Sequence, residues 1–361
     1  MNTVLTSTVP ASTLYTAAQF GDLHLKNRVV MAPMTRSRST DTALPTQEMV
    51  DYYSQRAGAG LIVAEGTSPS ADGMGYCRTP GIYNAEQIAA WRKVTDSVHA
   101  NGGTIVLQLM HCGRVATRDN KPAGSETVAP SALLAEVELF TDTVGMAPTD
   151  MPRELSNEEV YGVIEEYRQA AINAREAGFD GVELHGTSGY LPMQFMSENA
   201  NQRTDEFGGS LENRVRFPLL ALKAMSEAIG SGRVGFRFCP SNRFNDISDS
   251  QPADTLNALL DGIADMNLAY LHIMKAHTRK IDAFSVAREK FKGALIINDG
   301  FERDSAIDAV ASNKADAVSF ARHFIANPNL VERFENNREL AEFDRKTLYS
   351  GGAEGYSDYP A

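Results

Sequence analysis

The sequence predicts a single (β/α)8 barrel, which is a closed ring of eight parallel strands surrounded by helices. Three observations lead to this prediction: short apolar runs rich in Val, Ile and Leu recur, segments of helical length separate them, and there are eight such runs. Continuous apolar strands that alternate with helices indicate a parallel sheet covered by helices. The runs are Arg28–Met34, Gly60–Gly66, Thr104–Met110, Gly181–His185, Val234–Phe238, Tyr270–Met274, Ala294–Asn298 and Ala317–Phe320.

The helical segments between these runs are amphipathic. The helix expected from Asn157 has Ser156 as its N-cap, Glu159 as the capping-box partner and Gly178 as its stop. The main segments are Glu86–Asn101, Asn157–Gly178, Gly209–Ile229, Thr255–Met266 and Asp304–Ser312.

A doubly wound open sheet is the alternative architecture. Such a sheet usually opens with a glycine-rich dinucleotide turn, but Gly58 and Gly60 precede a strand instead of following one. The chain also lacks a GxxxxGK[ST] phosphate loop, an HExxH zinc motif and a GxSxG nucleophile elbow. No linker or repeat divides it. We therefore expect residues 1–361 to form one domain, with residues 1–12 flexible.

Composition and charge restrict the class of partner. Lys and Arg number 34 against 46 Asp and Glu, which gives a net charge of −12. Such a surface repels nucleic acid and anionic lipid, so we expect a small-molecule partner. No apolar run is long enough to span a membrane. The three widely spaced cysteines, Cys77, Cys112 and Cys239, and the lack of a visible secretory signal predict a reducing, cytoplasmic compartment.

Three insertions decorate the predicted barrel. Leu14–Lys26 reads as a short hairpin that could plug the bottom of the barrel, while Cys112–Leu155 and Gly186–Phe207 are long loops after strand ends. Because function in such barrels lies on the loops that follow the strands, we expect the two long loops to shape a site.

Polar side chains close nearly every predicted strand at its C-terminal end. Some of them could merely satisfy backbone groups at the barrel end, but Gln108 lies within an apolar run, where a buried amide needs partners. The polar strand-end residues are Thr35, Glu65, Gln108, His185, Arg237, His272, Lys275, Asn298 and Arg322.

The last two strands carry the pattern of a phosphate site. Asn298-Asp299-Gly300-Phe301 follows the seventh strand and Ala321-Arg322 follows the eighth, where barrels commonly bind phosphate through backbone N–H groups. Gly300 allows close backbone approach, and Arg322 could add charge-assisted contacts. The alternative is that Arg322 is simply a surface residue.

A third cluster follows the fourth strand. The segment from His185 to Leu191 offers an imidazole, the Ser188 hydroxyl and the Tyr190 phenol. Two donors at a strand end can hold one carbonyl oxygen or oxyanion, and a phenol nearby can donate a proton. His272 and His277 lack an acidic partner at ligand spacing, so no metal site is expected.

Six motifs occur together in this chain: Arg28–Thr35 (RVVMAPMT), Tyr53–Gly66 (YSQRAGAGLIVAEG), Gln108–Arg114 (QLMHCGR), Gly178–Leu191, Asn201–Arg214 (NQRTDEFGGSLENR) and Gly351–Pro360 (GGAEGYSDYP). On these motifs the chain resembles the Old Yellow Enzyme family of FMN-dependent ene reductases, which includes N-ethylmaleimide, pentaerythritol tetranitrate and xenobiotic reductases. The resemblance spans nearly the whole chain, and it implies a single (β/α)8 barrel with non-covalent FMN across its C-terminal mouth.

The resemblance also implies roles for individual residues. Pro33 and Thr35 would contact the central edge of the flavin, and Gly66 would approach it through its backbone. Gln108 and Arg237 would bind the pyrimidine end. The remaining implied FMN contacts are His185, Gly300, Phe301, Ala321 and Arg322, the last four at the phosphate.

On the substrate side, His185 and Ser188 would bind the carbonyl or nitro oxygen, and Tyr190 would supply the proton. Tyr76, Met110 and Tyr356 match positions that line the substrate cavity, and the tail 347–361 would lie near it. Three residues depart from the family pattern: Ser188 replaces Asn or His, Met110 replaces Trp, and Ala321 replaces Gly.

The activity implied is an NADPH- or NADH-dependent reduction of the activated C=C bond in α,β-unsaturated carbonyl or nitro compounds, with hydride from flavin N5 and a proton from Tyr190. Two alternatives stay open: a double-bond isomerase or reductase of a specialised substrate, given Ser188 and Met110, and a flavin-binding barrel without reductase turnover. The longer dienoyl-CoA reductases carry a cysteine run that this chain lacks. A monomer and a homodimer are both compatible with the acidic surface.

Overall fold

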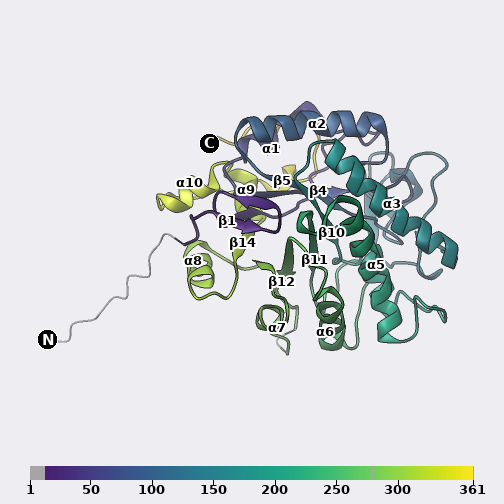
Figure 1. The fold of residues 1–361 in the computed structure, drawn as a ribbon. Coiled ribbons are helices and arrows are strands. Elements are labelled where there is room, and N and C mark those ends of the chain that lie inside the picture. The colour runs from purple at the N-terminus through teal and green to yellow at the C-terminus, as the bar shows by residue number, and fades with distance from the viewer. Residues whose placement is uncertain (1–12, 279, 361) are drawn as a thin grey trace.

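Eight parallel strands close into a barrel in the computed structural model, which describes residues 13–278 and 280–360 (Figure 1). The expectation that residues 1–12 are flexible lies outside the described residues. Each strand pairs with its neighbours in chain order, and the last pairs with the first, so the predicted (β/α)8 barrel is confirmed. The strands are β3 (Val29–Met31), β4 (Leu61–Thr67), β5 (Ile105–Leu109), β10 (Gly181–His185), β11 (Val234–Phe238), β12 (Tyr270–Met274), β13 (Ala294–Asn298) and β14 (Ala317–Phe320).

Helices surround the barrel (Figure 1). The five predicted helical segments are found within a few residues of their expected bounds, whereas the shorter α1 and α7 lie outside them. The helices are α1 (Gln47–Gln55), α2 (Ala85–Ala100), α3 (Asn157–Glu176), α5 (Leu211–Ile229), α6 (Pro252–Ile263), α7 (Ala283–Lys290) and α8 (Arg303–Ala311), followed by α9 (Arg322–Ala326) and α10 (Leu330–Glu335).

The ends of α3 confirm the predicted capping box. The Glu159 backbone N–H donates to Ser156 Oγ over 3.2 Å, and the Ser156 N–H donates to Glu159 Oε2 over 2.7 Å. Gly178 follows with a φ of 92°, and a Cβ there would lie 2.6 Å from the Thr95 hydroxyl. Both the backbone conformation and the packing therefore require glycine at this stop.

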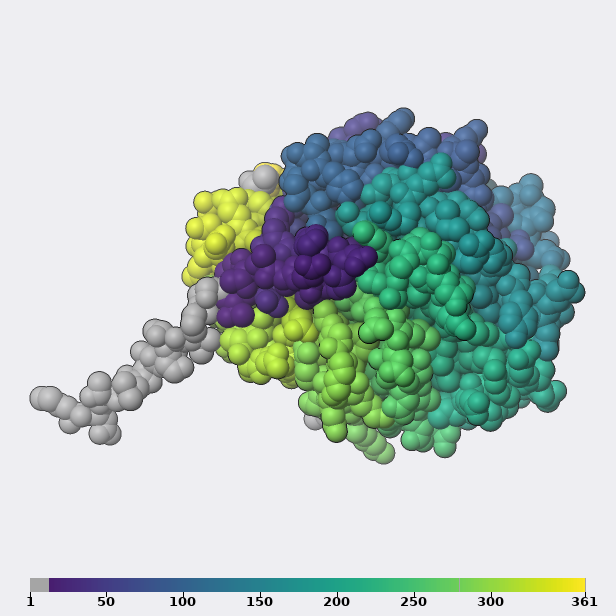
Figure 2. All heavy atoms as spheres, in the orientation of Figure 1, coloured from purple at the N-terminus to yellow at the C-terminus, as the bar shows by residue number. Residues whose placement is uncertain are grey.

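The predicted hairpin is β1 (Ala18–Phe20) paired antiparallel with β2 (Leu23–Leu25). Its apolar side chains pack against inward-facing residues at the lower ends of the strands, so the hairpin plugs the barrel bottom. In Figure 2 the purple surface of this segment lies between the early (blue) and late (green to yellow) elements. The cluster consists of Phe20, Leu23, Leu25, Val30, Leu61, Val63, Val106, Ala269, Tyr270, Ile296 and Ala317.

Inside the barrel, the character of the inward-facing side chains changes with height. The lower positions are apolar, and Gly235 makes room for the ring of Tyr270, which a Cβ would approach to 2.2 Å. Two residues further along the same strands the inward-facing positions are polar, as at Gln108, Arg237 and His272. The strand period of two thus produces a sealed lower end and a polar upper end.

The two long insertions fold above the polar end. The first holds a short helix η1 (Arg118–Asn120), the parallel pair β6 (Val128–Ala129) and β9 (Arg153–Glu154), and an antiparallel hairpin of β7 (Glu138–Thr141) and β8 (Gly145–Pro148). The second contains α4 (Leu191–Met196). Short helices η2 (Ser231–Arg233) and η3 (Arg345–Thr347) complete the chain. Among the residues that the structure covers, no helix has the length and apolarity that crossing a membrane would require.

Candidate active site

A cavity of about 820 Å³ opens at the polar end of the barrel. Segments from distant parts of the chain form its wall: the stretch after β3, the β7–β8 hairpin, the turn before α4, the start of α9 and the C-terminal segment. The predicted residues Thr35, Tyr76, Tyr190, Ala321 and Arg322 all line it, which places them in one space.

Tyr190 is hydrogen-bonded to a second phenol in this cavity. Its hydroxyl donates to the Tyr76 hydroxyl over 3.1 Å, and Asn245 Nδ2 donates to the same Tyr76 oxygen over 3.3 Å. Burial raises the pKa of Tyr190 well above its ordinary value, and the pKa of Tyr76 is raised for the same reason. Both phenols therefore keep their protons at neutral pH.

His185 lies beside Tyr190, with 4.9 Å between the ring centroids. Burial lowers its pKa well below the ordinary value, and the nearby Arg237 and His272 lower it further, so the imidazole is neutral. The Thr187 backbone N–H points to His185 Nδ1 at 3.4 Å. Because Nδ1 acts as the acceptor, the ring hydrogen belongs on Nε2, where it can be donated to a ligand.

Ser188 adopts a left-handed backbone conformation, with a φ of 61°. Its carbonyl accepts from Asn245 Nδ2 over 2.9 Å, so one amide secures both this turn and the Tyr76 hydroxyl. The turn places the Ser188 hydroxyl three residues from His185, at the same strand end.

Arg237 projects from β11 into the upper barrel. Its Nη2 donates to Asn298 Oδ1 over 3.1 Å, whereas Nε and Nη1 are buried and have no partner among the described residues. Burial lowers the Arg237 pKa, and the charge of Glu183 opposes that effect. Buried N–H groups need an acceptor, so these two nitrogens fit a ligand edge with ring nitrogen and carbonyl acceptors, such as the pyrimidine end of a flavin.

Gln108 is buried on β5 and donates through Nε2 to Glu183 Oε1 over 2.8 Å. The partner expected for this buried amide is therefore a carboxylate on the neighbouring strand. Glu65, another predicted strand-end residue, instead accepts from the Tyr53 hydroxyl over 3.1 Å, and burial raises its pKa to about 7.

Gly66 and Met110 lie against each other at the ends of β4 and β5. A Cβ on Gly66 would come within 2.6 Å of Met110 Sδ, so a larger residue there would require the Met110 side chain to move. Met110 packs with Tyr190 and Leu139 in a small buried cluster behind the cavity wall. Pro33 is half-buried in the segment between β3 and Thr35.

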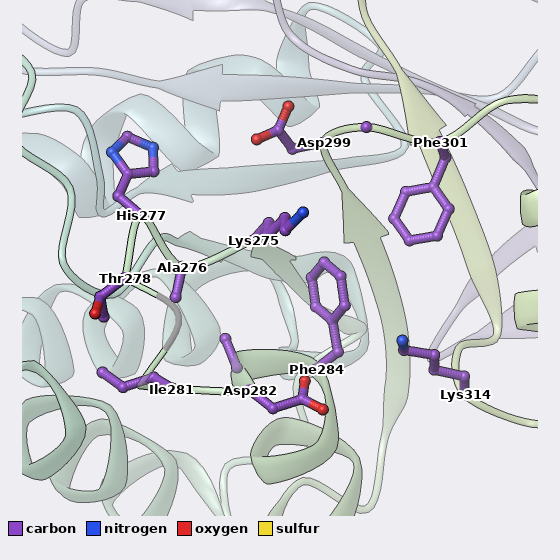
Figure 3. Close-up of a pocket in the computed structure, with 12 residues that line it drawn as sticks. Lys275, Ala276, His277, Thr278, Ile281, Asp282, Phe284, Asp299, Phe301 and Lys314 are labelled. Atoms are coloured by element: carbon purple, nitrogen blue, oxygen red, sulfur yellow. The ribbon is translucent and has the colours of Figure 1, made fainter.

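The four residues of the predicted phosphate site divide between two cavities. Ala321 and Arg322 line the 820 Å³ cavity, whereas Gly300 and Phe301 line a second one of about 600 Å³. Figure 3 shows this second cavity, which Lys275, His277 and Lys314 also border. Gly300 has a φ of 79° and no atom within 4 Å of where a Cβ would stand, so its backbone is open to a ligand.

Tyr356 does not lie where a cavity-lining role requires it. Its side chain is fully buried and stacks on Tyr52 with 4.0 Å between ring centroids. Arg36 and Arg38 explain this placement, because they donate to backbone oxygens of residues 347–355 and pull the segment inwards. The tail residues that reach the cavity are Leu348, Tyr349 and Ser350.

Other contributors to the site are absent from the sequence-based predictions. Phe140, Phe244 and Tyr349 form exposed parts of the cavity wall, and Asn245 organises the two phenols. Only the polar stretch around Asn245 offered a signal in the sequence. The aromatic residues lie in loops whose folded position no local pattern indicates.

A parallel barrel with a polar mouth, arginine donors that lack partners among the described residues and a neutral His–Tyr pair is the arrangement expected of a flavin-dependent oxidoreductase. A family model described as the NADH:flavin oxidoreductase / NADH oxidase family matches residues 13–341. 12-Oxophytodienoate reductase 2 of Arabidopsis thaliana is 37% identical over 357 residues, which cover 96% of this chain and 95% of that protein. A probable flavin mononucleotide-dependent alkene reductase of Leishmania infantum is 40% identical, covering 94% and 95% respectively.

Solved enzyme structures match the chain as well. Morphinone reductase matches with a TM-score of 0.92 and 43% identity over 96% of each chain. The old yellow enzyme homologue from Zymomonas mobilis matches with a TM-score of 0.93 and 36% identity over 97% of this chain and 99% of that one. The chain belongs to the Old Yellow Enzyme family, and it is an FMN-dependent NAD(P)H oxidoreductase.

Proposed function

We propose that the protein reduces the activated C=C bond of α,β-unsaturated carbonyl or nitro compounds. The observation that carries this proposal is the contact between a neutral imidazole donor, His185, and a protonated phenol, Tyr190, which itself lines the cavity. The names of the relatives, which include an alkene reductase and 12-oxophytodienoate reductases, support it. The net charge of −12 and the three free cysteines support a cytoplasmic monomer or homodimer without nucleic-acid partners.

The residues that would hold FMN surround the barrel mouth. Pro33, Thr35 and Gly66 would meet the ring from β3 and β4, while Gln108 and Arg237 would bind its pyrimidine end. The phosphate would lie against Gly300, Phe301, Ala321 and Arg322, whose contributions come from the ends of β13 and β14. When bound, FMN supplies the hydride from N5 after it has been reduced by NADPH or NADH.

The protein side of the reaction is a donor pair followed by a proton donor. His185 would donate Nε2–H to the substrate oxygen, and the Ser188 hydroxyl would be the second donor. Donors placed where negative charge develops lower the barrier to forming it. Tyr190 would then deliver its proton to the carbon α to the activating group, after its hydroxyl hydrogen turns from Tyr76.

The test separates the two half-reactions. In anaerobic stopped-flow measurements, Tyr190→Phe should slow reoxidation of the flavin by 2-cyclohexenone by about 10²-fold or more. Reduction of the flavin by NADPH should be unchanged, because that step needs no proton from Tyr190. Tyr161→Phe, on the exposed face of α3, is the matched control.

Equal loss in both half-reactions would remove the assigned role of Tyr190. Flavin absorbance that bleaches with NADPH but never returns with an enone or nitroalkene would contradict the proposed substrate class and favour a specialised acceptor. A protein that binds no FMN would contradict the whole proposal.

A further inference from the structure

Four buried polar side chains form a continuous hydrogen-bonded chain across the barrel interior. Gln108 on β5 donates to Glu183 Oε1 on β10 over 2.8 Å. Glu183 Oε2 lies 2.8 Å from His272 Nδ1 on β12. The other nitrogen of that ring, Nε2, lies 2.8 Å from the Ser319 hydroxyl on β14. All four side chains are at most 2% exposed. Nothing in the proposed chemistry uses Glu183, His272 or Ser319.

The charge of Glu183 determines where each hydrogen in this chain lies. Burial alone would raise the Glu183 pKa, but His272, Arg237 and Gln108 together hold it below the ordinary value, so the group is a carboxylate. Burial lowers the His272 pKa, so its ring is neutral. A carboxylate only accepts hydrogen bonds. His272 must therefore donate from Nδ1, and its Nε2 must accept from the Ser319 hydroxyl.

The same argument determines the orientation of the Gln108 amide group. The oxygen and nitrogen of an amide are usually distinguished only by their hydrogen-bond partners. Here the partner is an anion, so the NH2 group must face Glu183, and the carbonyl oxygen takes the opposite position. That oxygen has no hydrogen-bond donor among the residues described, so it is free to accept one from a ligand.

Glu183 also balances the charge of Arg237. The two residues stand on neighbouring strands, β10 and β11, and both are buried. The carboxylate raises the Arg237 pKa against the effect of burial. Arg237 still has two nitrogens that lack partners in the part of the chain that the structure describes, so the pair presents a nearly neutral site with free N–H donors.

We propose that Glu183 is a positioning residue for the flavin. It holds the Gln108 NH2 group, so the Gln108 carbonyl oxygen would be free to accept the N3–H of the pyrimidine ring, while the Arg237 donors would serve its other acceptors. Its negative charge also opposes the charge that the ring gains on reduction, so Glu183 lowers the midpoint potential. This inference rests on the proposed placement of FMN over this end of the barrel.

The test compares the holoprotein with Glu183→Gln, which keeps the shape and removes the charge. An amide at position 183 can donate an N–H to the Gln108 carbonyl oxygen, which would turn the Gln108 amide over. The Gln108 NH2 group would then face the flavin N3–H, and two donors cannot hydrogen-bond to each other. We expect the dissociation constant of FMN, followed by flavin fluorescence, to rise about five- to tenfold. We also expect the midpoint potential of the bound flavin to shift to a more positive value.

Three further variants make the outcome specific. Glu183→Asp keeps the charge, so it should leave the potential near the wild-type value even where FMN binding weakens. Ser319→Ala alters only the far end of the chain and should change neither quantity. If Glu183→Gln does not fold, His272→Phe removes one of the donors that keep the carboxylate charged, so both shifts should appear in smaller size.

An unchanged potential in Glu183→Gln that is saturated with FMN would overturn the proposal, because a merely structural role would lower thermal stability alone. Shifts of equal size in Glu183→Asp would do the same. The proposed substrate class is judged separately. If the wild-type holoprotein does not reduce enones, the proposed substrate class is contradicted. If Glu183→Gln nevertheless shows these shifts relative to that wild type, the role of Glu183 is still supported.

Discussion

The two halves of the site differ in how they are built. The half that comes from the strands, at Gln108, Glu183, Arg237 and His272, is buried and joined directly from side chain to side chain. The half that comes from loops exposes its aromatic groups, with Phe140 51%, Phe244 59% and Tyr349 61% exposed. The strand half is therefore a buried, directly connected network, whereas the loop half presents exposed aromatic groups to the cavity.

The loops are held mainly by arginines that bind backbone oxygens. Arg78 is the clearest example: its Nε donates to the Ser37 carbonyl over 3.1 Å, its Nη2 donates to the Tyr349 carbonyl over 2.8 Å, and its Nη1 pairs with Asp142 in the β7–β8 hairpin. One guanidinium thus joins three walls of the cavity. Such partly exposed contacts are individually weak, so a single substitution should displace the loop half of the site more easily than the strand half.

The largest expected effect comes from breaking the strand half at Arg237. Arg237→Leu removes a positive charge that helps to keep the buried Glu183 carboxylate ionised, and leaving a buried charge less compensated costs up to about 3–5 kcal/mol. We expect a lower free energy of unfolding in urea and loss of FMN during purification. The control is Arg233→Leu, whose guanidinium contacts the partly exposed Asp22 near the lower end of the barrel. Retained FMN and wild-type stability in Arg237→Leu would contradict the comparison.

A buried histidine next to the strand half should make the protein sensitive to acid. Burial lowers the pKa of His111, two residues past the end of β5, to about 3, whereas an unfolded histidine titrates at about 6.5. The unfolded state therefore binds more protons between these two values, and stability falls as the pH drops below about 6.5. Each buried neutral histidine contributes at most about 1.4 kcal/mol per pH unit.

We expect His111→Asn, whose side-chain oxygen can accept the Gly113 N–H that now meets His111 Nδ1 at 3.1 Å, to reduce this slope. Urea unfolding between pH 4.5 and 7.5 measures it. An unchanged slope would mean that the folded state takes up the proton and that His111 is not held neutral.

A smaller effect should follow from Ser188→Asn. This substitution tests the turn where the strand half of the site joins the loop half. Asn tolerates the φ of 61° at this position better than Ser does. Its amide also reaches further as a donor to the substrate oxygen. We expect kcat/KM for 2-cyclohexenone to rise several-fold, with flavin reduction by NADPH unchanged. A fall in kcat/KM would show that Ser188 suits a different acceptor.

The smallest effect should come from the loop half. Asp142→Asn weakens one of the three contacts of Arg78, and exposed pairs contribute about 0.2–1 kcal/mol. We expect KM for a bulky enone to change no more than about fivefold. KM for 2-cyclohexenone should change less, and kcat should stay constant. Glu165→Gln, in the exposed pair with Arg168 on α3, serves as the control. A large fall in kcat would instead place the β7–β8 hairpin in the chemistry.

The same division explains what could be predicted from the sequence. Each barrel strand and the polar layer above it follow from short apolar runs and a period of two, so Gln108, His185 and Arg237 could be singled out, while the cluster of polar groups that follows His185 indicates Tyr190. The loop half depends on contacts between distant parts of the chain, such as Arg36 with the Leu348 carbonyl, 312 positions apart. No local pattern could tell that Tyr349 reaches the cavity while Tyr356 turns inwards onto Tyr52.

The hairpin that plugs the lower barrel has a kinetic consequence. With that end filled by Phe20, Leu23 and Leu25, the nicotinamide and the acceptor must enter and leave by the same mouth. We expect both to bind over the same face of the flavin, so each would exclude the other while it is bound. Double-reciprocal plots of rate against NADPH concentration at several enone concentrations should be parallel lines. An excess of NADPH should slow turnover by binding the reduced enzyme, and an excess of enone should slow it by binding the oxidised enzyme.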